Sequence, residues 1–174
     1  MLVQRILRGS RRSVIECRVL GRGGLLDARR VIAHIDQFRQ QSRNLQKVVA
    51  CIDCEDYTVG EVLNEVSRVV AEIRRQEPPL IPDYIIVMHA LEAWTGGDEE
   101  ALRTYLKTPP GKHLRLPTEN DPRPKQTLRR LFQQYRRDFL ETRDNPRLAQ
   151  IVALDVLRRY NSSFAEFEQK VLDP

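Results

Sequence analysis

The chain has 174 residues, of which 41% are hydrophobic and 30% are charged, as expected of one globular domain over residues 1–174 and not of a disordered chain. No apolar run approaches the roughly 20 residues of a membrane-spanning helix, and Met1 to Arg12 is too basic for a signal peptide. Three cysteines cannot all pair, so we expect a cytoplasmic protein with no membrane partner.

The formal net charge is +5, from 29 lysines and arginines against 24 aspartates and glutamates. Arginines are concentrated between Arg5 and Arg12 and again between Arg123 and Arg137. Guanidinium groups match phosphate oxygens well, so this pattern favours a polyanionic partner such as nucleic acid. The same charges would also suit a solvated helix face, and charge alone does not separate the two interpretations.

The first part of the chain predicts alternating strands and helices. Strands are expected at residues 13–20, 47–53 and 83–88, a glycine-rich loop at 21–24, and helices at 28–41 and from Thr58 to the prolines that begin at Pro78. Thr58 and Glu61 have the spacing of a capping box for the second helix. This order indicates an α/β fold with a small parallel sheet and crossover helices.

Helices dominate the remainder of the chain. A short helix is expected at residues 99–106, a proline-rich loop at 108–124, two longer helices around Leu128–Tyr135 and Leu148–Val152, and a last helix capped by Ser163 and Glu166. We therefore predict an α/β core over residues 1–107 and a helical C-terminal part over 108–174 that packs on the sheet as a cap.

Three acids lie at the end of one predicted strand. In a parallel sheet, ligands bind beyond the carboxyl ends of the strands, where Asp53, Glu55 and Asp56 fall. Side chains two apart in an extended segment point the same way, so Asp53 and Glu55 are expected to converge on one cation, Mg²⁺ or Mn²⁺. The alternative is that the acids cap the helix that follows.

The next strand also leads into polar residues. Glu92 is expected beside the first cluster if the two strands are neighbours, and with His89 it could complete a coordination shell or act as a general base. The alternative makes Trp94 a core residue and His89 a hydrogen-bonded group at the strand end.

Several segments together resemble known families. Val48–Asp56, an apolar strand with an acidic end, resembles the D-x-D-type motif of Toprim domains. His89–Trp94 followed by Asp98 resembles the E-x-E-A-W-x-x-x-D stretch of the bacterial family catalogued as domain of unknown function 4276. Asp121–Lys125 and Asn161–Phe167 resemble that family's D-P-K and S-P-S-F-x-x-F segments, so the resemblance spans about residues 48–167.

The resemblance implies a Toprim-like or Rossmann-like fold, related to nuclease domains of overcoming-lysogenization-defect and RloB-type proteins. It implies Mg²⁺-dependent (or Mn²⁺-dependent) cleavage of nucleic-acid phosphodiesters, DNA or RNA, in phage defence or a mobile-element system. The implied catalytic residues are Asp53, Glu55 and Glu92, and the metal ligands are Asp53, Glu55 and Asp56. Nucleic-acid contacts would come from Lys125, Arg123, Arg129 and Arg130. The remaining candidate site residues are His89, Trp94 and Asp98.

One departure from the family pattern leaves two functions open. The family's first strand carries an E-G-x-T-E signature, whereas this chain opens on Met1–Leu7, which resembles the first helix of the pattern. Either an upstream segment supplies the catalytic Glu, or the protein is a catalytically inactive Toprim-like module that binds nucleic acid or a partner ATPase as a sensor subunit. A missing first strand would leave a sheet edge for another chain, possible in a homo-oligomer.

Overall fold

The structure is a computed structural model that describes residues 2–8, 21–42, 45–109 and 111–173. Within those ranges it is a mixed α/β fold in which helices predominate. The elements are α1 (Leu2–Ile6), α2 (Gly21–Leu25), α3 (Ala28–Gln41), β1 (Val49–Asp53), α4 (Val59–Arg75), β2 (Asp83–Val87), α5 (Glu92–Gly96), α6 (Glu99–Leu106), α7 (Pro124–Gln134), α8 (Glu141–Ile151), α9 (Leu154–Tyr160) and α10 (Ser162–Leu172).

The two described strands form a parallel pair, with α4 as the crossover between them. Val49 lies opposite Asp83 and Asp53 lies opposite Val87, so both strands end at the same edge. The predicted capping box starts α4, because Thr58 Oγ1 accepts from the Glu61 N–H at 3.2 Å and Glu61 Oε2 accepts from the Thr58 N–H at 2.8 Å.

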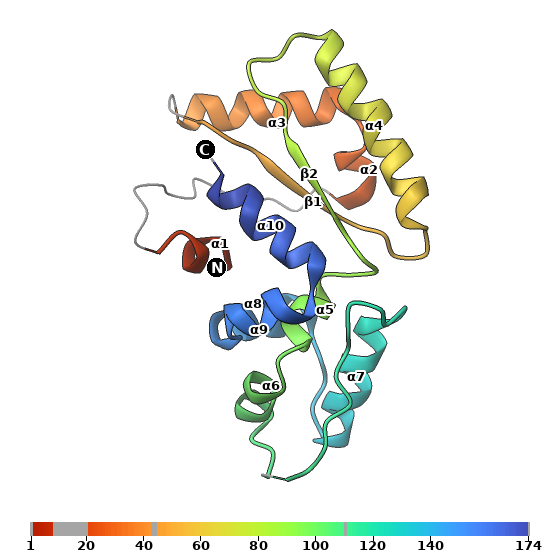
Figure 1. Cartoon of the computed structure of the whole chain (residues 1–174), viewed down its shortest axis with the longest axis vertical. Coiled ribbons are helices and arrows are strands. Elements are labelled where there is room, and N and C mark those ends of the chain that lie inside the picture. The colour runs from red at the N-terminus through yellow and green to blue at the C-terminus, as the bar shows by residue number, and fades with distance from the viewer. Residues whose placement is uncertain (1, 9–20, 43–44, 110, 174) are drawn as a thin grey trace.

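Helices cover both faces of this strand pair (Figure 1). On one face, α3 and α4 pack together over the strands, with Ile35 and Ile73 fully buried among their apolar residues. On the other face, α10 lies along β2, and α1 packs against α10. Helices α5 to α9 gather at the end of the molecule toward which the strands run. Their position makes the strand ends an internal junction between the sheet and the helical part.

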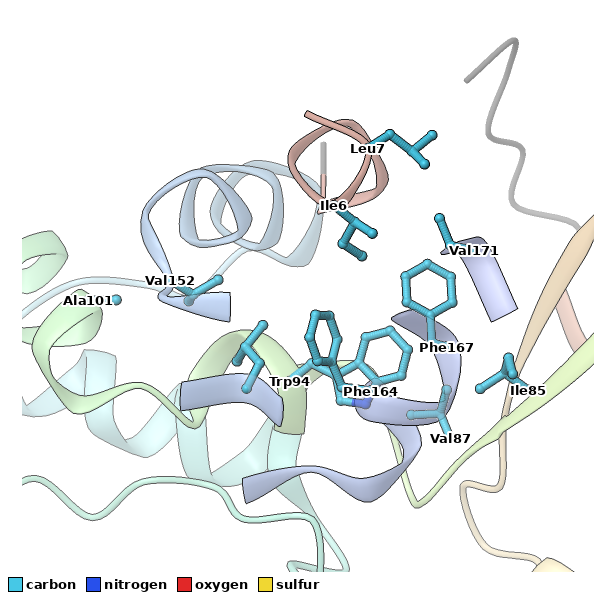
Figure 2. Close-up of a cluster of buried hydrophobic side chains, with 11 residues drawn as sticks. Ile6, Leu7, Ile85, Val87, Trp94, Ala101, Val152, Phe164, Phe167 and Val171 are labelled. Atoms are coloured by element: carbon cyan, nitrogen blue, oxygen red, sulfur yellow. The ribbon is translucent and has the colours of Figure 1, made fainter. Parts of the chain in front are cut away.

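An aromatic cluster fixes α5 against α10. Figure 2 shows Trp94 beside Phe164 and Phe167, with ring centroids 5.3 and 5.2 Å from Trp94. Its indole Nε1 donates to Ser163 Oγ at 3.0 Å, so the one polar atom of this buried side chain is satisfied. Burial of the three rings sets where α5 begins, and hence where Glu92 lies.

A close approach between α5 and α7 requires a residue without a Cβ. A Cβ built at Gly96 would lie 2.5 Å from Pro117 Cγ and 2.8 Å from Leu128 Cδ2. A larger residue there would force the buried Leu128 side chain, Pro117 or α5 itself to shift.

Most predicted elements are confirmed. The strands at residues 49–53 and 83–87 are parallel, and the helices at 28–41 and 99–106 are present. In the predicted cap over residues 108–174, α10 packs along the sheet, whereas α7 to α9 gather beyond the strand ends. The predicted strand at 13–20 lies outside the described residues. No helix in the described ranges is long and apolar enough to span a membrane.

Two local predictions are wrong. Residues 21–25 form the short helix α2 instead of a loop, because Leu25 and Leu26 pack on the apolar residues of β1 and α4. The cap of α10 comes from another segment: the Glu119 carboxylate accepts from the N–H groups of Ser162 and Ser163, both at 2.9 Å. Helices α5 and α9 were not predicted.

Candidate metal centre at the strand ends

The ends of β1 and β2 are held together beyond the last paired residues. The Cys54 N–H donates to the Val87 carbonyl and the Glu55 N–H donates to the His89 carbonyl, both at 2.9 Å. Glu55 and His89 both adopt left-handed backbone conformations, with φ of 50° and 59°. Such conformations are unfavourable for residues other than glycine, and they are concentrated at functional sites.

Asp53 is the last residue of β1, and its side chain shares a face with Cys51, which borders the core under α10. Burial, and after it the nearby Glu92 charge, raise the pKa of Asp53 to about 7. The Lys125 ammonium and a hydrogen bond from the Leu91 N–H act in the opposite direction. Asp53 Oδ1 is buried and has no hydrogen-bond partner, which is costly for a carboxylate.

Glu92, the first residue of α5, is only 3% exposed. Its Oε1 accepts from Asn145 Nδ2 at 2.8 Å, and Asn145 Oδ1 accepts from Thr95 Oγ1 at 3.1 Å. Glu92 Oε2 is also buried without a hydrogen-bond partner. Two neighbouring carboxylates therefore each present one unsatisfied buried oxygen at the strand ends, and we call Asp53 and Glu92 the carboxylate pair.

The donor set of the carboxylate pair fits Mg²⁺ or Mn²⁺. These ions prefer oxygen ligands, and Mg²⁺ is commonly held by one or two carboxylates while water and substrate phosphate complete its shell. Across the described ranges, no group of three or more His, Cys, Asp or Glu residues is arranged to hold a metal ion. An ion between Asp53 and Glu92 would have these two unsatisfied oxygens within its reach as protein ligands.

Glu55 turns toward a basic residue instead of following strand alternation. The strand ends at Asp53 and the left-handed backbone of Glu55 breaks the extended geometry, so the i, i+2 argument does not apply. Lys125 Nζ lies 3.9 Å from Glu55 Oε1 and 3.8 Å from Glu141 Oε2. Arg129 also pairs with Glu141, at 3.0 Å. The predicted nucleic-acid contacts Lys125 and Arg129 are thus both in ion pairs, and Lys125 is also close enough to Asp53 to act on its charge.

The other predicted residues at this edge border an adjoining hollow of about 380 Å³. Asp56, His89 and Arg123 lie on its wall, and His89 Nδ1 is buried without a hydrogen-bond partner. Asp56 is exposed and is not among the charges that act on Asp53. Arg130 is exposed on α7.

Two of the candidates have structural roles. Trp94 belongs to the aromatic cluster. Asp98 caps α6, since its Oδ1 accepts from the Ala101 N–H at 3.1 Å, and its Oδ2 accepts from the Ala153 N–H at 2.7 Å. Both oxygens are occupied, so Asp98 is a structural tie between α6 and α9.

The sequence did not indicate two residues of the site. Asn145 orients Glu92 from 53 positions away, in a helix of the C-terminal part. Arg22 of α2 donates to the Asp53 carbonyl at 3.4 Å, pairs with Glu65, and lies 3.9 Å above the Tyr57 ring. No local motif marks either residue.

Comparisons with known proteins give no match: no protein-family model, curated protein or solved structure is significantly similar to the chain. The resemblance to Toprim domains therefore stays a prediction.

Proposed function

We propose that the chain cleaves nucleic-acid phosphodiesters with a divalent cation held by Asp53 and Glu92. The observation that supports this proposal is the carboxylate pair itself, with two unsatisfied buried oxygens at the carboxyl end of a parallel strand pair. A cation there would satisfy both oxygens and remove the repulsion between the two charges.

A bound ion would neutralise charge on the phosphate and would make a coordinated water more acidic. The residues of the chain position this chemistry. Asp53 must lose its proton to bind the ion, and Asn145 holds Glu92 in one orientation. Lys125 lies close enough to act on the Asp53 charge, so it can contact a phosphate at the same place when it leaves Glu55.

The basic residues of α7 supply the remaining attraction for a polyanion. Arg129 and Arg130 follow Lys125 on this helix, and the chain carries a net charge of +5. Contacts of this kind are made to the phosphate backbone, so binding should weaken with salt and depend little on sequence. A role in phage defence or a mobile element, with a partner ATPase, is the corresponding biological prediction.

The test compares Asp53→Asn with Asp36→Asn, which removes the same charge from an exposed position on α3. Wild type and Asp36→Asn should cleave labelled DNA or RNA with Mg²⁺ or Mn²⁺ and not with chelator. Asp53→Asn should lose the activity by two orders of magnitude or more. Equal cleavage by Asp53→Asn would refute the proposal.

A second function is favoured by the ion pairs of Lys125. Because this lysine contacts Glu55 and Glu141, the basic residue nearest the centre is already partly neutralised. A binding or sensor module that needs no catalysis would tolerate that arrangement. It predicts that wild type binds nucleic acid, or an ATPase partner, without cleaving any substrate under any cation.

A further inference from the structure

An aromatic ring, Tyr57, lies in the turn between β1 and α4, four residues after Asp53. Tyr57 is 48% exposed, and its N–H donates to the Cys54 carbonyl at 2.9 Å, which closes the turn. The Arg22 guanidinium lies 3.9 Å from the ring centroid and so covers one face. Arg22 is itself fixed by Glu65 and by the carbonyl of Asp53.

The exposed part of Tyr57 borders the hollow of about 380 Å³, a volume within the range of small-ligand sites. Val59, Met88 and Pro122 give this hollow apolar walls. Its charged lining sets the carboxylates of Glu55 and Asp56, which would repel a phosphate, against the one guanidinium of Arg123, so acids outnumber bases there. The hollow therefore suits a neutral planar group with donors on its edge better than it suits an anion.

We infer that the hollow receives an unpaired nucleobase stacked on Tyr57, from a single-stranded segment of the substrate. This inference rests on the proposed function, since the strand would continue from this base to a phosphate at the carboxylate pair. A base inside a duplex is stacked on its neighbours and cannot present its face, so the protein should prefer single strands. Glu55 and Asp56 can accept from the amino groups of a base, as carboxylates do from cytosine.

The arrangement also explains why Arg22 is held so firmly. A side chain that already has a fixed position loses little conformational entropy on binding. Arg22 contacts the ring and the backbone carbonyl of Asp53 at once, so it links the stacking surface to the backbone of one member of the carboxylate pair. A base on Tyr57 would therefore place a neighbouring phosphate reproducibly.

The test measures binding of labelled single-stranded and duplex oligonucleotides by fluorescence anisotropy in chelator, where cleavage cannot occur. Tyr57→Phe keeps the ring and should bind single strands like wild type. Tyr57→Leu should bind them about tenfold more weakly, the order that one stacked base contributes. The matched control is Tyr160→Leu, because Tyr160 is 61% exposed and lies outside the hollow; it should bind like wild type.

Unchanged single-strand binding by Tyr57→Leu, or equal wild-type affinity for single strands and duplexes, would overturn the inference. Thermal unfolding of each variant distinguishes lost binding from lost folding. Failure of the proposed function has a separate signature: Tyr57-dependent binding with no cleavage in Mg²⁺ or Mn²⁺. Cleavage that needs Asp53 while binding ignores Tyr57 would refute the stacking site alone.

Discussion

Two kinds of buried acid occur in this molecule. In the helical part, Asp144 is fully buried, and both of its oxygens are occupied. Oδ1 accepts from the Tyr105 hydroxyl at 2.7 Å and from Arg143, and Oδ2 accepts from the Leu140 N–H at 2.7 Å. At the strand ends, Asp53 and Glu92 each keep one buried oxygen without a partner.

The pKa values of Asp144 and Asp53 shift in opposite directions. Burial alone would raise the pKa of Asp144, but hydrogen bonds from Arg143, Tyr105 and Leu140 outweigh burial and lower it. Burial and the Glu92 charge raise the pKa of Asp53 to about 7. Satisfied acids such as Asp144 hold elements together. The carboxylate pair costs stability, a cost expected where an acid is kept for a ligand.

Removal of Asp144, the acid whose oxygens are both hydrogen-bonded, should change the free energy of unfolding the most. Asp144→Ala leaves the Leu140 N–H and the Tyr105 hydroxyl without their partner, so we expect a loss of about 3 kcal/mol in the free energy of unfolding. The lowered pKa means that this stabilisation is present above the unfolded value of 3.8 and is lost as pH falls through the folded pKa. Urea unfolding near pH 7 measures it, with Asp36→Ala as control; a loss below about 1 kcal/mol would contradict it.

Removal of the Asp53 charge should increase the free energy of unfolding, in contrast to removal of Asp144. Since the pKa of Asp53 rises from 3.8 to about 7 on folding, the native state binds the proton more tightly and stability falls as pH rises across that interval. Asp53→Asn should therefore be more stable than wild type by about 2 kcal/mol near pH 8 in chelator, after allowance for partial exposure. The two proteins should converge near pH 4 in urea unfolding. A destabilised Asp53→Asn at pH 8 would assign Asp53 to the same class as Asp144.

Loss of the contact that orients Glu92 should weaken cation binding less than loss of the Asp53 charge. Asn145→Ala removes the donor to Glu92 Oε1, and loss of a residue that orients a ligand typically weakens metal binding by about tenfold. Asn64→Ala, at an exposed position of α4, is the control. Mn²⁺ titration calorimetry gives both affinities, and equal values would remove Asn145 from the site.

The smallest effect is the pH dependence of cation binding. A cation competes with the proton on Asp53, so affinity should rise about fivefold from pH 6 to pH 7 and about twofold from pH 7 to pH 8, around a pKa of about 7. A flat profile over this range would show that Asp53 is already ionised or does not bind the ion.

Local sequence predicts some features of the strand ends and not others. Strand polarity, the Thr58 capping box and the parallel order were visible in the chain, and the proximity of Glu92 to Asp53 followed from neighbouring strands. The backbone turn at Glu55 could not be predicted, because no glycine marks the left-handed conformation at that position.

Contacts between distant segments account for the remaining differences. The carboxylate of Glu119 caps α10 from a loop 43 residues earlier, and Asn145 reaches Glu92 from α8. Gly21–Leu25 is helical despite three glycines, because its leucine packs on the strand layer. Each depends on tertiary packing that overrides local propensity.

The most direct test of the central claim is Mn²⁺ titration calorimetry near pH 8 on wild type, Asp53→Asn and Asp36→Asn. We expect one site per chain in wild type and Asp36→Asn and none in Asp53→Asn, although Asp53→Asn should be the more stable protein without metal. Equal binding by all three proteins, or no binding by wild type, would contradict the assignment of the carboxylate pair as a metal centre.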